Sequence, residues 1–236
     1  MHMPYKAALI VGAGPGLGAS LARAFTRDAG MRVVMAARHL DRLQPVADAL
    51  GATALRCDAT SEAEVAALFD RAGDVLGMAP DVVVYNASRR VRGAFVDVDA
   101  NEVAQAVAVT AHGAFVVAQQ AARRMLPQGQ GALLFTGASA GVKGFAHSAA
   151  FAMGKFALRG LAQSLARELH PQGIHVGHFV IDGAIRPSSG STPSSPNASD
   201  SQLDPDAIAQ TYLHFLAQPR NAWSWEMELR PWVEKF

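Results

Sequence analysis

Short apolar runs alternate with longer amphipathic segments along most of this chain, and the alternation restricts the fold more than any other feature. A short run of consecutive apolar residues is typical of a parallel strand that is buried on both faces. The intervening segments have the period of helices, which cover such a sheet. We therefore predict an α/β fold with a doubly wound parallel sheet and helices on both faces. The expected strands span residues 7–11, 32–36, 52–56, 82–85, 132–136 and 175–181, and the expected helices span 16–28, 40–50, 61–76, 101–126 and 151–170.

The 236 residues are half hydrophobic, which is enough for one substantial core and favours a single domain over residues 1–236. The formal net charge of +1 provides no argument for a nucleic-acid partner. Arg89, Arg90 and Arg92 form the only tight basic group. A solvated loop explains this group better than a phosphate-binding patch does, so we expect no nucleic-acid binding.

The single cysteine, Cys57, excludes an internal disulfide and is consistent with a reducing compartment. It lies in an apolar strand-like run, so we expect it to be a small core residue and not a nucleophile. No cationic and apolar leader is apparent at the beginning of the sequence, and no uncharged apolar run is as long as a membrane span. These features predict a soluble cytoplasmic protein with no membrane partner.

Local signals mark several element boundaries. Ser61 and Glu64 have the spacing that satisfies the free amides at a helix start, and Asp204-Pro205-Asp206 predicts the start of a late helix. Residues 187–203 are rich in Ser, Pro, Asn and Gly, so they form either a mobile surface loop or a lid. The lid is favoured because this stretch leaves the sheet at the end where open α/β sheets bind ligands. The tail, 223–236, carries three tryptophans and a phenylalanine, which predicts a last strand and an anchored terminus.

A glycine-rich loop, Gly12-Ala13-Gly14-Pro15-Gly16-Leu17-Gly18, follows the first predicted strand and opens the first predicted helix. In this context glycines allow the main chain to turn tightly and to approach a pyrophosphate, whose charge the helix start favours. The loop therefore predicts a dinucleotide site in a Rossmann-like fold. The alternative is a tight turn with no ligand.

The end of the second predicted strand indicates which dinucleotide is bound. An acidic side chain there would accept hydrogen bonds from the ribose of NAD, whereas an arginine suits the additional phosphate of NADP. This position holds Arg38, and no Asp or Glu occurs between the second predicted strand and Asp41. The sequence therefore favours NADP over NAD, although an arginine at a strand end is often only a surface residue.

With these residues in place, the chain resembles the short-chain dehydrogenase/reductase family over nearly its whole length. Gly12, Gly16 and Gly18 match the three family glycines, and Asn86-Ala87-Ser88 is similar to the family's Asn-Ala-Gly. Asp58 resembles the aspartate that faces the adenine, and Lys155 matches the lysine of the family's Tyr-x-x-x-Lys, which binds the nicotinamide ribose. The cofactor-binding residues that we expect are Gly12, Gly14, Pro15, Gly16, Leu17, Gly18, Arg38, Asp58, Ala59, Asn86, Ala87, Ser88, Lys155, Gly183 and Ile185. No metal site is expected.

The departures from the family pattern lie where the family does its chemistry. Phe151 stands where the resemblance implies the tyrosine that exchanges a proton with the substrate oxygen. Ala138 stands in place of the serine that orients this oxygen, and Thr110 in place of the asparagine that holds a water beside the lysine. The Pro-Gly after the sixth strand is replaced by Asp182-Gly183. Of the four catalytic positions, only Lys155 keeps the family residue.

Other side chains offer a substitute for the missing proton donor. Ser139 is one residue beyond the expected serine, and His147 carries an imidazole, the side chain most often used as a general acid or base. Lys143 belongs to the same loop. The plain alternatives are a turn residue for Ser139 and exposed loop side chains for the other two. Tyr85 and Tyr212 are predicted to be core residues.

Two functions remain open. The favoured one is an NADP-dependent oxidoreductase that acts on a carbonyl or alcohol substrate, with Lys155, Ser139 and His147 as catalytic candidates. The alternative is an inactive NADP(H)-binding sensor or scaffold. Loss of catalysis would then be the one cause of the replacements at Phe151, Ala138 and Thr110. A third, remote interpretation places the Arg89–Arg92 group beside the cofactor, where it binds an acidic substrate. The resemblance also implies a homodimer or homotetramer that pairs the helices predicted at 101–126 and 151–170.

Overall fold

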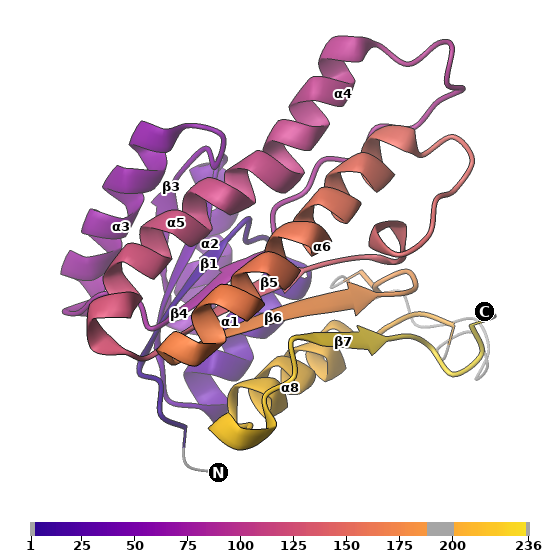
Figure 1. Cartoon of the computed structure of the whole chain (residues 1–236). Coiled ribbons are helices and arrows are strands. Elements are labelled where there is room, and N and C mark those ends of the chain that lie inside the picture. Colours follow the sequence, from indigo (N-terminus) through magenta and orange to yellow (C-terminus); the bar gives the residue numbers. More distant parts are fainter. Residues whose placement is uncertain (1–2, 188–200, 235–236) are drawn as a thin grey trace.

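The computed structural model describes residues 3–187 and 201–234. Their centre is one seven-stranded sheet in the order β3-β2-β1-β4-β5-β6-β7, and every neighbouring pair of strands is parallel (Figure 1). This confirms the predicted α/β fold with a doubly wound parallel sheet. The strands are β1 Ala7–Val11, β2 Arg32–Ala37, β3 Thr53–Arg56, β4 Val82–Tyr85, β5 Gly131–Thr136, β6 Ile174–Ile181 and β7 Glu226–Leu229.

Helices cover both faces of the sheet because the central strands are apolar on both sides. Leu9 and Val83 pack into one core layer, whereas Ile10 and Val84, their neighbours along the strands, pack into the other. Figure 1 shows α3, α5 and α6 across one face and α1 and α8 behind the sheet. The helices are α1 Leu17–Arg23, α2 Leu40–Leu50, α3 Glu62–Leu76, α4 Ala100–Val107, α5 Gly113–Met125, α6 Ala149–Leu169 and α8 Pro205–Leu216.

The helix predicted at 101–126 is interrupted by a π-helical turn, Ala108–His112, between α4 and α5. The Tyr85 hydroxyl donates a hydrogen bond to the Val109 carbonyl inside this turn. A Cβ on Gly113 would lie 2.5 Å from the same hydroxyl, so the buried tyrosine requires a glycine where α5 begins. The sequence period did not reveal this interruption, since a π-turn adds a residue without changing the apolar pattern strongly.

The predicted boundaries of two helices are confirmed. The Ser61 side chain accepts from the Glu64 amide at 3.3 Å, and Asp204 caps α8 by accepting from the Asp206 amide at 2.9 Å. The Glu64 carboxylate does not reach back to Ser61, however. It accepts from the Asp58 amide at 3.0 Å and pairs with Arg56, which fixes the loop after β3. The predicted last strand is also present, as β7.

The predicted core residues are buried as expected. Cys57 and Tyr85 lie in one core layer, and Tyr212 lies in the other, where its hydroxyl and that of Thr136 are 2.9 Å apart. Of the stretch proposed as a lid, residues 188–200 lie outside the described residues. Leu203 is buried, and its amide donates to the Ala184 carbonyl at 2.8 Å beyond the end of β6. Within 3–187 and 201–234, no helix is long and apolar enough to cross a membrane.

Candidate functional site

The carboxyl ends of the parallel strands meet at one edge of the sheet, and three hollows open along this edge. The strand order reverses between β1 and β4, which is where open α/β sheets bind ligands. The first hollow, the loop hollow, has a volume of about 310 Å³ and lies beside the glycine-rich loop. Its lining includes predicted cofactor residues from four strand ends: Gly12, Gly14, Pro15, Arg38, Asp58, Ala59, Asn86, Ala87 and Ser88.

The glycine-rich loop is held tightly on its inner side. Gly12 has a φ of +81°, and a Cβ there would lie 2.3 Å from the Ala87 backbone nitrogen. The Asn86 side-chain amide donates to the Gly12 carbonyl at 3.0 Å, so this predicted cofactor residue fixes the loop itself. Gly14 and Gly16, in contrast, have no atom within 4 Å of where a Cβ would be. The loop is therefore packed against β4 and open on the side that a ligand could approach.

Basic side chains border the outer end of the loop hollow. Arg38, just after β2, and Arg42, in the first turns of α2, are both exposed, and both line the hollow. Asp58 faces the same hollow. Burial alone would raise the pKa of its carboxyl, but hydrogen bonds from the Thr60 amide and hydroxyl hold it below its ordinary value. Arg42 was not among the residues predicted from the sequence, although it lies only four residues after Arg38.

The second hollow, the inner hollow, has a volume of about 420 Å³ and contains Lys155. This lysine is only 3% exposed, and its Nζ donates to the Thr136 carbonyl at 2.7 Å. Burial, together with the nearby Arg90 charge, lowers the pKa of Lys155 to about 7. The other predicted residues that line the inner hollow are Leu17, Asn86, Ser88, Gly183 and Ile185.

The Phe151 ring lies close to two cations, Lys155 and Arg90, and Arg90 belongs to the basic group that the third sequence interpretation placed beside the cofactor. Phe151 is 7% exposed; the Lys155 Nζ lies 5.8 Å from its ring centre, and the Arg90 guanidinium carbon lies 4.5 Å from it. No tyrosine lines the inner hollow, because Tyr85 and Tyr212 are buried in the core and Tyr5 precedes β1. Of the two cations beside this buried ring, the Arg90 guanidinium is the closer.

The third hollow, the outer hollow, has a volume of about 730 Å³ and lies beyond Phe151. Ser139, Lys143 and His147 line it, and none of the three lines the inner hollow, where Ala138 lies instead. His147 is exposed and has a positive φ of 59°. Ser139 and His147 therefore line one hollow, and Lys155 lines the adjoining one.

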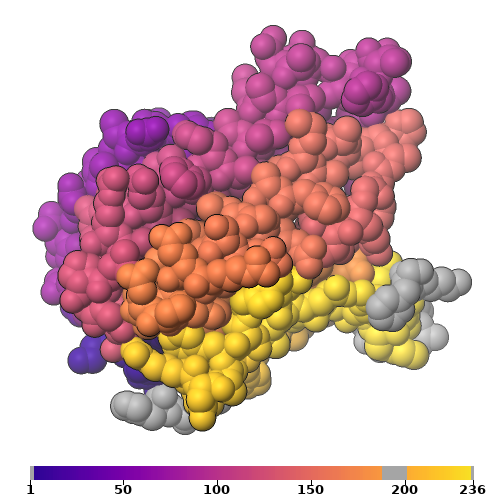
Figure 2. Space-filling view, in the orientation of Figure 1, coloured from indigo at the N-terminus to yellow at the C-terminus, as the bar shows by residue number. Residues whose placement is uncertain are grey.

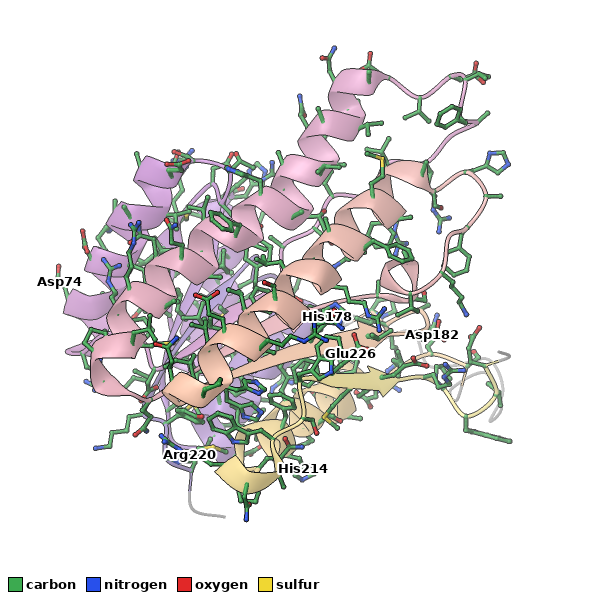
Figure 3. The ribbon with its side chains drawn as sticks, in the orientation of Figure 1. Asp74, His178, Asp182, His214, Arg220 and Glu226 are labelled. Atoms are coloured by element: carbon green, nitrogen blue, oxygen red, sulfur yellow. The ribbon has the colours of Figure 1, made fainter. Side chains whose placement is uncertain are left out.

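A polar cluster around the buried His178 lies where α6, β6 and β7 meet, and Figure 3 labels its His178 and Glu226. The His178 Nδ1 donates to the Glu226 carboxylate at 3.0 Å, and Arg159 binds the same carboxylate through two nitrogens at 2.7 and 2.8 Å. Burial lowers the pKa of His178 to about 4, although the Glu226 charge opposes this shift, so the ring is neutral at pH 7. None of these residues lines a hollow described above, and the cluster joins β7 to the rest of the sheet.

Among the residues that the structure describes, no group of three or more His, Cys, Asp or Glu side chains could hold a metal ion. The groups that line the hollows at this edge of the sheet are glycine backbone, guanidinium groups, the buried Lys155 and a few other polar side chains, among them Asp58, Ser139 and His147.

Comparisons with known proteins agree with this geometry. Residues 6–192 match the family model described as short chain dehydrogenase. An uncharacterized oxidoreductase of Staphylococcus aureus (strain N315), SA2266, is 30% identical over 233 residues, which cover 96% of this chain and 97% of the relative. A short-chain dehydrogenase structure from Rhodopseudomonas palustris is 32% identical, covers 96% of this chain and 99% of its own, and superposes with a TM-score of 0.80.

An alcohol dehydrogenase from Thermococcus sibiricus, solved with 5-hydroxy-NADP, shares the fold. Its TM-score is 0.84 at 24% identity, and the match covers 98% of each chain. Taken with the family match and the 30% identical relative, the sheet order and the glycine-rich loop lead to one conclusion: this chain belongs to the short-chain dehydrogenase family of oxidoreductases.

Proposed function

We propose that this protein is an NADP(H)-dependent oxidoreductase that interconverts a carbonyl compound and an alcohol. The observation that carries the proposal is the placement of Arg38 and Lys155 at the two ends of the connected loop and inner hollows, with the glycine-rich loop between them. NADP needs binding groups in this order along its length: cations for the additional phosphate, backbone amides for the pyrophosphate and a hydrogen-bond donor for the second ribose. When bound, the nicotinamide would supply or accept the hydride.

The residues have distinct proposed roles. The loop from Gly12 to Gly18 approaches the pyrophosphate, and Asp58, Ala59 and Ala87 border the adenosine. Arg38 and Arg42 bind the 2′-phosphate, since guanidinium groups bind phosphate oxygens in pairs. Lys155 donates to the nicotinamide ribose, and Gly183 and Ile185 border the nicotinamide. The Thermococcus sibiricus enzyme, which was solved with a modified NADP, has the same fold.

Proton transfer is the step that this chain cannot perform in the usual way of its family. Phe151 has no proton to exchange, and Lys155 is turned to the Thr136 carbonyl. The proton for the substrate oxygen comes from Ser139, from His147 or from water in the outer hollow. Positioning of the substrate supplies the remaining rate acceleration, because a hydride acceptor held in the reactive orientation loses no further translational and rotational entropy on the way to the transition state.

We expect Arg38→Gln to weaken NADPH binding by roughly tenfold or more and to leave NADH binding nearly unchanged, because a charge-assisted contact to the 2′-phosphate is lost. Isothermal titration calorimetry with both cofactors measures this. Arg71→Gln, an exposed change on α3 away from the hollows, is the control. Equal affinity of the wild type for NADPH and NADH would overturn the NADP assignment, and no affinity for either would overturn the proposed function.

A second candidate function is an inactive NADP(H)-binding sensor or scaffold. Phe151, which is buried beside Lys155 and Arg90, favours this second function because its ring offers no hydroxyl to a substrate. Tight NADPH binding without turnover on a panel of aldehydes, ketones and oxo acids would select this candidate.

We also propose that the chain forms a homo-oligomer through α5 and α6. Phe115, Met153 and Phe156 project from these helices and are 48, 55 and 45% exposed. A hollow of about 270 Å³ lies between the same helices and includes Phe115 and Leu165. Exposed apolar groups on adjacent helices indicate an interface.

We expect Phe115→Glu with Phe156→Glu to convert a dimer or tetramer into monomers, because two charges would be buried without partners. Light scattering after gel filtration measures the mass. The control carries Val75→Glu, an exposed apolar residue on α3. A monomeric wild type at micromolar concentration would contradict the proposal.

A further inference from the structure

The Arg90 guanidinium lies at the junction of the inner and outer hollows. Arg90, Phe151, Gly183 and Ala184 line both of them. The guanidinium is stacked on Phe151, and its charge contributes to the lowered pKa of Lys155 in the inner hollow. A group bound to Arg90 would therefore lie beside the place where the hydride would be transferred.

The three neighbouring arginines have different surroundings. The Arg89 side chain is ion-paired with Glu102 at the start of α4 and lines neither hollow. Among the residues that the structure describes, Arg90 and Arg92 make no ion pair, and both line the outer hollow. Two guanidinium groups without a carboxylate partner thus face one hollow.

The carboxyl groups of the outer hollow do not neutralise these two arginines. Asp182, labelled in Figure 3 beyond the end of β6, is 3.2 Å from Arg230 and 3.7 Å from Lys143. Its charge is thus shared by two other cations. Glu234 lies at the rim and is exposed.

The remaining wall of the outer hollow combines apolar residues with the polar side chains of Ser139, His147 and Ser148. Phe151 and Phe145 provide two rings, and Ala140, Ala146 and Ala184 also line the hollow. In the space-filling view the molecule is notched on the side where the yellow C-terminal segment faces the orange 139–148 loop (Figure 2). A pocket with apolar walls and a few convergent polar and charged groups is typical of a site for a small ligand, and the two guanidinium groups favour a ligand of negative charge.

We propose that the substrate is a small carbonyl compound that carries an acid group, a carboxylate or a phosphate, which binds Arg90 and Arg92. This inference rests on the proposed oxidoreductase function. The acid group occupies the outer hollow, and the carbonyl points past Phe151 into the inner hollow. Because Arg90 borders both hollows, the acid group and the carbonyl lie within a few bonds of each other, as in a 2-oxo acid or a phosphorylated ketone.

The test measures ligand binding to the NADP⁺-saturated protein by calorimetry, which does not depend on turnover. The probes are benzoylformate with its methyl ester, and dihydroxyacetone phosphate with dihydroxyacetone. We expect the charged member of at least one pair to bind roughly ten- to a hundredfold more tightly than its neutral partner. The pair that shows the preference identifies a carboxylate or a phosphate as the acid group.

Arg90→Gln is expected to abolish the preference for the charged probe, and Arg92→Gln is expected to reduce it. The control is Arg89→Gln, which removes the same charge from the neighbouring position and is expected to keep the preference. Melting curves of all variants establish that they are folded. Equal binding of charged and neutral probes, or an equal loss in Arg89→Gln, would overturn the acid-group proposal. Failure of the proposed function is a separate outcome: either NADP⁺ does not bind, or NADPH binds without turnover of any carbonyl compound, and neither result depends on whether the charged probes are preferred.

Discussion

Replacing Phe151 with tyrosine is expected to raise the rate of carbonyl reduction by roughly a hundredfold to ten-thousandfold, the usual contribution of a positioned proton donor. The ring is buried at the boundary of the inner and outer hollows, and the Lys155 ammonium lies 5.8 Å from its centre. Cations at this distance lower the pKa of a phenol, since they favour its charged form. Steady-state assays with NADPH and a panel of aldehydes, ketones and oxo acids measure the gain.

Two controls separate the hydroxyl from changes in packing. Phe151→Leu provides no proton donor and is expected to show no gain. Lys155→Met in the Phe151→Tyr background is expected to remove most of the rate gain. The phenol then loses its cationic neighbour, and the cofactor loses a hydrogen-bond donor. If Phe151→Tyr binds NADPH but gains no rate, the proton is supplied elsewhere, and Ser139→Ala or His147→Ala should then reduce the wild-type activity.

Replacing Lys155 with methionine is expected to make the protein more stable at pH 6 and to weaken NADPH binding about tenfold. The lysine is 3% exposed, and its pKa falls from 10.5 to about 7 on burial. This difference corresponds to about 5 kcal/mol of destabilisation at low pH, of which we expect roughly 2 kcal/mol to be recovered, because methionine also loses the bond to Thr136. Binding residues often reduce stability in this way.

The pH dependence identifies the cause of the stabilisation. Below pH 7 the lysine is charged in both the folded and the unfolded chain, so the burial penalty is complete. Between pH 7 and 10.5 the unfolded chain binds more protons, so the stability contributed by this site rises with pH. Urea denaturation at pH 6, 8 and 10 should therefore show the advantage of Lys155→Met shrinking as the pH rises.

Lys143→Met is the matched control, since the Lys143 side chain is 42% exposed and pairs with Asp182 at the surface of the outer hollow. It is expected to change stability little at any of the three pH values. An equal advantage of Lys155→Met at every pH would show that better packing, and not removal of a buried charge, is responsible.

Much of the fold could be predicted because the relevant signals are local. The apolar runs of β1, β4 and β5 are buried on both faces, and the Ser61 and Asp204 caps use bonds to amides two or three residues away. The glycine-rich loop is also a local signal, although only the structure showed why Gly12 is required: Ala87, from the other side of the switch point, lies against it.

The arrangement of charged groups in the site could not be predicted in the same way. Arg90 and Phe151 are 61 positions apart, and their stacking depends on how the loop after β4 lies over the start of α6. Ala138 and Ser139 are adjacent in the chain, yet they line different hollows. A shift of one residue reverses the direction of a side chain along an extended backbone, so spacing alone could not assign either to Lys155.

The sequence by itself determined the α/β fold, the dinucleotide-type loop and the family, because periodicity, glycine placement and capping act over a few residues. The tertiary structure alone decided which charges are buried, which are paired and which are free. It showed Lys155 enclosed against Thr136, Arg89 paired with Glu102, and Arg90 without a carboxylate partner among the described residues. The physical reason is that burial and ion pairing depend on distances between segments far apart in the chain, which packing sets and local pattern does not encode.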